Sequence, residues 1–148
     1  MQKRPFIQQK PNIPFPHAEL THKIIGICYE IANELGSGFL ESVYQNALGI
    51  AFRQANMKAL SQVRMSVAFR GENVGDFIAD FLIEGKVIVE IKAVTSLAPE
   101  HSAQVLNYLK ASNLDVGLLV NFGRPSIEIR HLHHPRLQAS ARVNLKNP

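Results

Sequence analysis

The sequence predicts an α/β domain with a mixed β-sheet, because helical and strand patterns follow one another in a set order along the chain. Two stretches with apolar residues at three- and four-residue spacing come first, and three strand-like stretches follow them. A third helical stretch then precedes two further strands. With 148 residues, 46% of them hydrophobic, the chain is long enough for one domain with one core.

The two ends of the chain differ in composition from its middle. Residues 1–18 hold four prolines and are predicted to form an extended arm, residues 19–132 the domain, and residues 133–148 a C-terminal tail. The net charge of +4 comes from the ends, since residues 19–123 hold eight basic and eleven acidic side chains. Basic ends can be solubilising tails or can bind phosphates, so composition alone does not identify a partner.

Several classes of protein are excluded at this stage. No stretch approaches the roughly 18 apolar residues of a membrane span, and the N-terminus lacks the apolar run of a signal peptide, so we expect a cytoplasmic protein without a membrane partner. The single cysteine, Cys28, excludes an internal disulfide and is expected to be a small core residue. The histidines of residues 131–134 have no cysteine or acid nearby, which favours solvated side chains over a zinc site.

Two helices are predicted at the start of the domain. The first apolar stripe consists of Leu20, Ile24, Ile27, Ile31 and Leu35. Gly36 is expected to end this helix, and a second helical stripe covers residues 40–55. Glu41 lies in the first turn of the second helix, where the helix dipole favours a carboxylate, so its position alone indicates a helix-start acid.

An antiparallel meander of three strands is predicted over residues 62–69, 74–83 and 86–93, with turns at residues 70–73 and 84–85. A helix should follow, from a cap at Thr95 or Ser96 to about Ala111. The continuous apolar run within residues 115–122 indicates a strand covered on both faces, and the alternating residues 127–131 indicate an outer fifth strand.

Charged side chains interrupt the second and third strands, where a buried sheet has none. Asp80 lies in the second strand, and Glu90 and Lys92, two residues apart, project from one face of the third. The alternative is a solvated face whose Glu90–Lys92 pair contributes roughly a few tenths of a kcal/mol. Against this alternative, the helix that covers the sheet carries polar residues at helical spacing: His101, Gln104 and Tyr108.

The loop between these strands decides whether Asp80 shares the face of Glu90. A two-residue loop, Glu84-Gly85, would place the two carboxylates on opposite faces. A three-residue loop, Ile83-Glu84-Gly85, would place Asp80 opposite Ile88 and diagonal to Glu90. We expect the odd-length loop.

Two carboxylates on one side of a sheet repel each other, and a divalent cation would neutralise them. Magnesium is expected, with manganese as the alternative, because it takes carboxylate, water and phosphate oxygens. The ion could lower the pKa of a bound water and polarise phosphorus. The Lys92 ammonium could orient or activate the attacking water, or stabilise charge on the phosphate.

Asp80 followed by Glu90-Ile91-Lys92 resembles the motif of the PD-(D/E)xK nuclease superfamily. The order of elements is similar to the restriction-endonuclease-like αβββαβ core of that superfamily, with one extra N-terminal helix and an outer fifth strand. Ala79 stands where the superfamily name has proline. The chain also resembles the GxxExxY protein family over residues 19–132, and the naming motif reads Gly38-Phe39-Leu40-Glu41-Ser42-Val43-Tyr44.

The resemblance implies a magnesium- or manganese-dependent nuclease acting on DNA. Asp80 and Glu90 would be metal ligands, Glu41 would reach the metal site from its helix, and Lys92 would be the catalytic base or stabiliser. Gln104 matches a position that aligns the lysine, water or phosphate in such nucleases. Further candidates of second rank are Tyr44, Tyr108 and His101.

Two other functions stay open. The chain could be a binding module that keeps the nuclease fold without turnover and engages nucleic acid or protein through its basic ends. Alternatively, the sheet edge at residues 127–132 could pair with another chain, which would make the protein a homodimer or part of a larger assembly.

Overall fold

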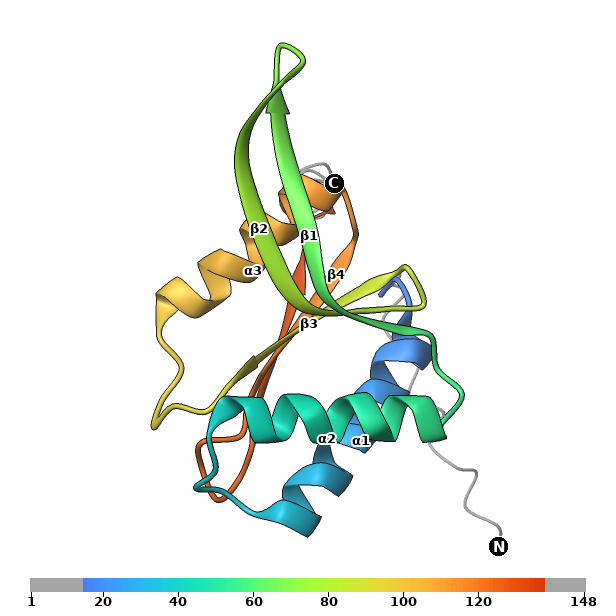
Figure 1. The fold of residues 1–148 in the computed structure, drawn as a ribbon, viewed down its shortest axis with the longest axis vertical. Coiled ribbons are helices and arrows are strands. Elements are labelled where there is room, and N and C mark those ends of the chain that lie inside the picture. The colour runs from blue at the N-terminus through green and yellow to red at the C-terminus, as the bar shows by residue number, and fades with distance from the viewer. Residues whose placement is uncertain (1–14, 138–148) are drawn as a thin grey trace, which may run out of the picture.

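The computed structural model describes residues 15–137, so residues 1–14 of the expected arm and 138–148 of the expected tail lie outside the described part. Its elements, in chain order, are α1 (Ala18–Leu35), α2 (Glu41–Gln54), β1 (Ala59–Phe69), β2 (Glu72–Ile83), β3 (Val87–Lys92), α3 (Pro99–Ser112), β4 (Val116–Asn121) and β5 (Glu128–His133). One sheet holds the strands in the order β1-β2-β3-β4-β5. Only β3 and β4 run parallel, which confirms the predicted mixed α/β architecture (Figure 1).

Helices α1 and α2 pack on one face of this sheet and α3 packs on the other. The first layer has the larger core, in which Ile24, Leu48 and Phe52 are fully buried against strand residues such as Phe81. Cys28 belongs to this core as expected, and its burial raises the pKa of the thiol to about 12. No helix within residues 15–137 has the length and apolar character needed to cross a membrane.

The first hairpin corrects two expected boundaries. Strand β1 begins three residues earlier than predicted, because residues 59–61 pair with residues 81–83 of β2. The turn has two residues instead of four, and both Arg70 and Gly71 have positive φ, 50° and 80°. Such turns match the twist of the strands, and the register shift between Val67 and Ala68 absorbs the extra residue.

The start of α3 also differs from the expectation. Neither Thr95 nor Ser96 caps the helix, since the N-cap is Ala98. The imidazole Nδ1 of His101 accepts a hydrogen bond of 3.0 Å from the Ala98 main-chain N–H. This contact supplies the side-chain half of a capping arrangement, and Pro99 follows at the first helical position.

The β1–β2 hairpin changes face along its length. In β2, Phe81 packs into the core under α1 and α2, whereas Ala79, two residues away, packs into the core under α3. Between these positions lies Asp80, and Gln62 of β1 lies beside it with a φ of 53°. A left-handed non-glycine residue inside a strand is uncommon and marks a sharp twist. The outer half of the hairpin therefore extends beyond the sheet (Figure 1).

Candidate active site

The loop between β2 and β3 brings two carboxylates together. It has three residues, Glu84-Gly85-Lys86, which confirms the odd length but places the loop one residue later than expected. Phe81 pairs with Val89 in the last pair of this ladder. The next residues outward are Asp80 and Glu90, which therefore face each other directly rather than diagonally.

Side chains replace main-chain pairing at the point where β2 and β3 separate. The Ile91 N–H donates a hydrogen bond of 2.8 Å to Asp80 Oδ2, and the Asp80 N–H donates one of 3.4 Å to Glu90 Oε2. The Gln62 amide approaches Asp80 Oδ1 at 3.5 Å. Asp80 and Glu90 are only 7% and 4% exposed, so each carboxylate is buried and held by the strand that carries the other.

This proximity shifts the protonation of Glu90. Burial, followed by the charge of Asp80, raises the pKa of Glu90 to about 9. At neutral pH the metal-free pair therefore retains a proton. Burial and the charges of Glu90 and Asp80 also raise the pKa of Tyr108, which places its phenol on α3 within electrostatic reach of the pair.

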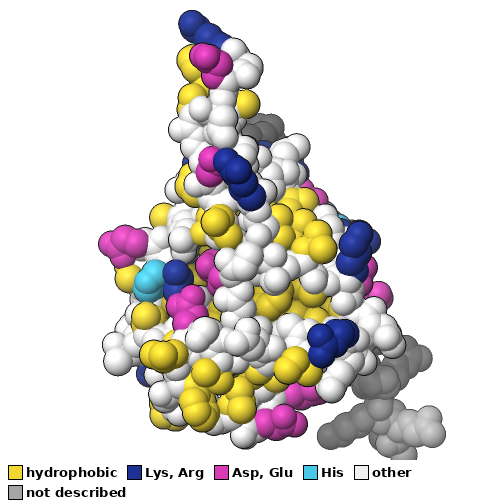
Figure 2. Space-filling model, in the orientation of Figure 1, with side chains coloured by type: hydrophobic (Ala, Val, Ile, Leu, Met, Phe, Trp, Pro, Cys, Tyr) yellow, Lys and Arg dark blue, Asp and Glu magenta, His cyan; other side chains and the backbone are white. Residues whose placement is uncertain are grey.

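Lys92 and Glu41 complete the group. Burial and the charge of Asp80 raise the pKa of Glu41, while the charges of Lys92 and His101 act in the opposite direction. Lys92 is half-buried and has no salt bridge within residues 15–137, so the Glu90–Lys92 surface pair is not formed. Figure 2 shows acidic, basic and histidine side chains gathered where β3 ends beside the start of α2.

Tyr44 holds the segment that precedes Glu41. Its fully buried ring stacks on Phe122 with a centroid separation of 4.7 Å. The Tyr44 hydroxyl donates a hydrogen bond of 2.6 Å to the Gly36 carbonyl and accepts one of 3.3 Å from the Phe39 N–H. These bonds fix the segment that leads into α2, and Glu41 is the first residue of that helix.

The polar residues predicted on α3 have different surroundings. His101 caps the helix through Nδ1 and lies within electrostatic reach of Glu41. Gln104 is half-buried, and within the described part of the chain its side chain makes no hydrogen bond. Tyr108 follows one helical turn later and forms an edge contact with Phe77.

Asn121 is a buried residue beside the site that the sequence did not single out. It is fully buried, and its amide bonds both main-chain groups of Val94, at 3.0 Å to the N–H and 2.9 Å to the carbonyl. A Cβ atom at Gly123 would lie 2.2 Å from the same carbonyl. Together, Asn121 and Gly123 hold the segment that follows Lys92 against β4. The only available signal was an asparagine at the end of an apolar strand.

The donor set fits magnesium or manganese. Among residues 15–137, no three side chains of His, Cys, Asp or Glu lie close enough to form a complete metal site. Asp80 and Glu90 nevertheless provide two hard oxygen donors whose mutual repulsion a cation would relieve. Magnesium is usually bound by one or two carboxylates and completes its coordination with water and phosphate.

Comparisons with known proteins identify a family model and two similar structures. A family model described as the PD-(D/E)XK nuclease superfamily matches residues 18–132. The crystal structure of SSO0001 is similar, with a TM-score of 0.51 and 21% identity over 88% of this chain and 68% of that one. A crystal structure of an alkaline exonuclease, LHK-Exo from Laribacter hongkongensis, has a TM-score of 0.48 and 10% identity over 85% of this chain and 75% of that one.

The likeness to SSO0001 concerns the fold alone, and it agrees with the restriction-endonuclease-like architecture predicted from the sequence. No curated protein matches the chain.

Proposed function

The chain belongs to the PD-(D/E)XK nuclease superfamily, and from this membership we propose that it is a divalent-metal-dependent phosphodiesterase acting on DNA. The observation that carries the proposal is the buried pair of Asp80 and Glu90, with Lys92 on the same face of β3. A surface salt bridge would need neither burial nor two carboxylates at one point. Within the superfamily, we assign the chain to the GxxExxY family and expect it to work in the cytoplasm.

Asp80 and Glu90 would hold magnesium or manganese, which when bound would neutralise the pair and polarise the phosphodiester. A water oxygen attacks phosphorus, the bond from phosphorus to one ester oxygen breaks, and a phosphomonoester and a hydroxyl result. The Lys92 ammonium orients this water or donates hydrogen bonds to the phosphate oxygens. Gln104, on α3, aligns the attacking water or the phosphate, and Glu41, on α2, reaches the metal site.

The test is cleavage of plasmid, linear and branched DNA, with RNA in parallel, in magnesium or manganese. We expect DNA cleavage that EDTA abolishes and that falls at least about 100-fold in Glu90→Gln and in Lys92→Ala. Lys110→Ala, which removes an exposed cation at the end of α3, is the control and should cleave normally. Salt-sensitive DNA binding that persists in Asp80→Ala, without cleavage, would favour the binding module. Equal cleavage by a Glu90→Gln, Lys92→Ala double variant would contradict the proposed site.

A further inference from the structure

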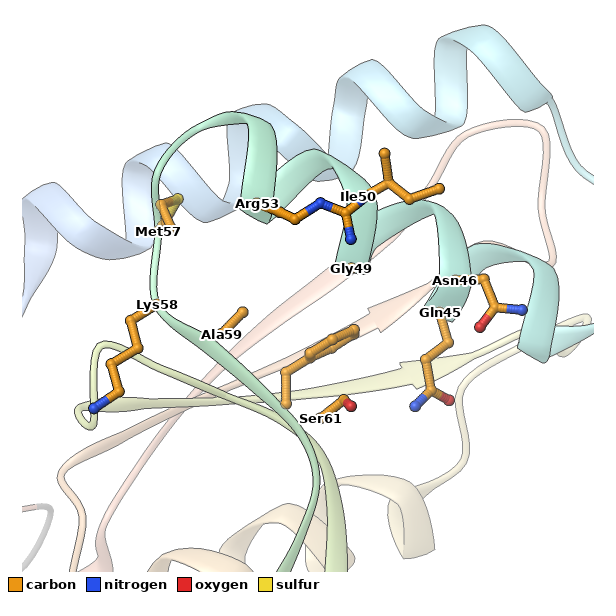
Figure 3. Close-up of a pocket in the computed structure, with 10 residues that line it drawn as sticks. Gln45, Asn46, Gly49, Ile50, Arg53, Met57, Lys58, Ala59 and Ser61 are labelled. Atoms are coloured by element: carbon orange, nitrogen blue, oxygen red, sulfur yellow. The ribbon is translucent and has the colours of Figure 1, made fainter.

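A groove of about 670 Å³ lies between α2 and β1 (Figure 3). Gln45, Gly49 and Arg53 line it from the helix, and Lys58 and Ser61 line it from the strand side. Figure 3 shows Gln45 projecting from α2 toward the strand that carries Ser61. This volume is in the range of ligand-binding pockets. The residues that line the groove have no role in the cleavage reaction proposed above.

Both walls of the groove lead to the candidate active site. On α2, Glu41 is followed at four-residue intervals by Gln45, Gly49 and Arg53, so the four form one continuous row that turns about 40° around the helix axis at each step. Arg53 is about 18 Å from Glu41 along the helix axis, at about 1.5 Å per residue. On β1, Ser61 directly precedes Gln62, the residue whose amide approaches Asp80.

The charges of the groove favour an anionic occupant. Its lining includes two cations, Arg53 and Lys58, and no carboxylate. Neither cation forms a salt bridge within the described residues. Outside the lining, Glu41 lies at the start of α2, near the proposed metal-binding pair, and the Glu84 carboxylate accepts a hydrogen bond of 2.7 Å from the Lys58 main-chain N–H. Two cations along a groove that leads toward a proposed metal site suit a chain of phosphates.

The floor of the groove has room for a backbone. Gly49 places no side chain there, and a Cβ atom at this position would make only ordinary contact with the Phe81 ring, at 4.0 Å. Gln45 and Ser61 offer hydrogen bonds from opposite walls. Polar and basic groups of this kind contact sugar and phosphate without reading sequence.

We propose that this groove binds the DNA strand next to the scissile phosphate, with Arg53 and Lys58 contacting backbone phosphates and Gln45 and Ser61 contacting the sugars or base edges between them. The proposal rests on the proposed function, because it takes the carboxylate end of the groove as the site of cleavage. It assigns the groove a substrate class, and its contacts imply little sequence preference.

The test measures binding of fluorescein-labelled single-stranded and duplex DNA by anisotropy in EDTA, over a series of NaCl concentrations. We expect the double variant Arg53→Gln, Lys58→Gln to raise the Kd about tenfold and to reduce the slope of log K against log salt by about 1.4 for single strands or 1.8 for duplex. The charge-matched control is Arg70→Gln, Lys110→Gln, which alters exposed residues outside the groove and should bind normally. Gly49→Leu, which fills the groove without changing charge, should also weaken binding.

Equal losses in the groove and control variants, or no DNA binding by the wild type, would overturn the groove assignment. Thermal melts check that each variant is folded. Because binding is read without metal, a protein that binds through the groove but cleaves nothing contradicts only the proposed function. If the wild type cleaves DNA, the double variant should raise KM with kcat within about twofold, since the altered residues lie away from the reacting phosphate.

Discussion

The main-chain N–H of Ile91 donates a hydrogen bond of 2.8 Å to the carboxylate of Asp80. A side chain of β2 thereby takes the place of the β2 main chain at the point where this strand leaves β3. The opening lets Glu90 lie opposite Asp80 inside the sheet, with the Asp80 N–H as its partner. The fold therefore uses main-chain hydrogen bonds to hold together two carboxylates that repel each other. This repulsion costs free energy of folding, and the cost can be measured.

The metal-free protein should lose stability as pH rises, and Glu90→Gln should remove this loss. The pKa of Glu90 is about 9 in the folded state against 4.5 as the ordinary value, so the folded state binds more protons between these limits. Stability then falls from about pH 4.5 to about pH 9. In EDTA at pH 8, Glu90→Gln should be more stable than wild type by at least about 1 kcal/mol. Urea unfolding at pH 5 and pH 8 measures the difference.

The difference in stability between wild type and Glu90→Gln should shrink toward pH 5. At that pH, Glu90 is protonated in part of the unfolded wild-type population as well as in the folded protein. A Glu90→Gln variant that is less stable than wild type at pH 8 would contradict the raised pKa.

Magnesium or manganese should raise the melting temperature of the wild type and leave Asp80→Asn and Glu90→Gln unchanged. A ligand that binds only the folded state stabilises it by RT ln(1 + [L]/Kd), which is about 1.4 kcal/mol at ten times the Kd. The matched control is Asp76→Asn, because Asp76 is an exposed carboxylate bonded to Arg64 on the hairpin. This variant makes the same carboxylate-to-amide change and should keep the full metal response. An equal response in all four proteins would mean that the cation binds elsewhere.

The sequence was sufficient to predict that the loop between β2 and β3 has an odd number of residues. Charges on one face of β3 and polar residues on α3 required Asp80 to share that face, and only an odd-length loop satisfies this requirement. The change of face at Gln62 could not be predicted, because a left-handed glutamine has no sequence signature comparable to that of glycine.

The role of Tyr44 could not be predicted from the motif either. Helical spacing showed that Tyr44 lies one turn after Glu41, but only tertiary packing shows that its hydroxyl bonds back to the Gly36 carbonyl. The hydrogen bonds between Asn121 and Val94 join residues 27 positions apart, and local sequence patterns cannot predict a contact of this kind.

Tyr44→Phe should destabilise the fold by about 1 kcal/mol, since it keeps the ring that stacks on Phe122 and removes the hydroxyl bonds to Gly36 and Phe39. If the segment before α2 positions Glu41, kcat for DNA cleavage should fall as well, with KM little changed. Tyr29→Phe is the control, because Tyr29 is 48% exposed on α1. Wild-type stability and kcat in Tyr44→Phe would show that the motif tyrosine acts through neither bond.

Asn121→Asp should be the most destabilising of these changes, although it keeps the size of the side chain. The Asn121 Nδ2 donates to the Val94 carbonyl at 2.9 Å and to Glu128 Oε1 at 3.1 Å, and a carboxylate oxygen would face both acceptors. A buried, partly unpaired charge of this kind costs about 2–4 kcal/mol. Urea unfolding at pH 8 measures the loss, and Asn107→Asp, on the exposed face of α3, controls for the added charge.

Asn121→Asp also tests how Lys92 is positioned. Asn121 anchors Val94, which lies two residues after Lys92 in the chain. Under conditions where Asn121→Asp remains folded, kcat should fall about tenfold or more, as expected when a catalytic group is misplaced by a change outside the site. Asn107→Asp should cleave DNA at the wild-type rate. A folded Asn121→Asp protein with wild-type kcat would show that Lys92 keeps its position without the hydrogen bonds between Asn121 and Val94, and that the orientation of its ammonium is set within β3 itself.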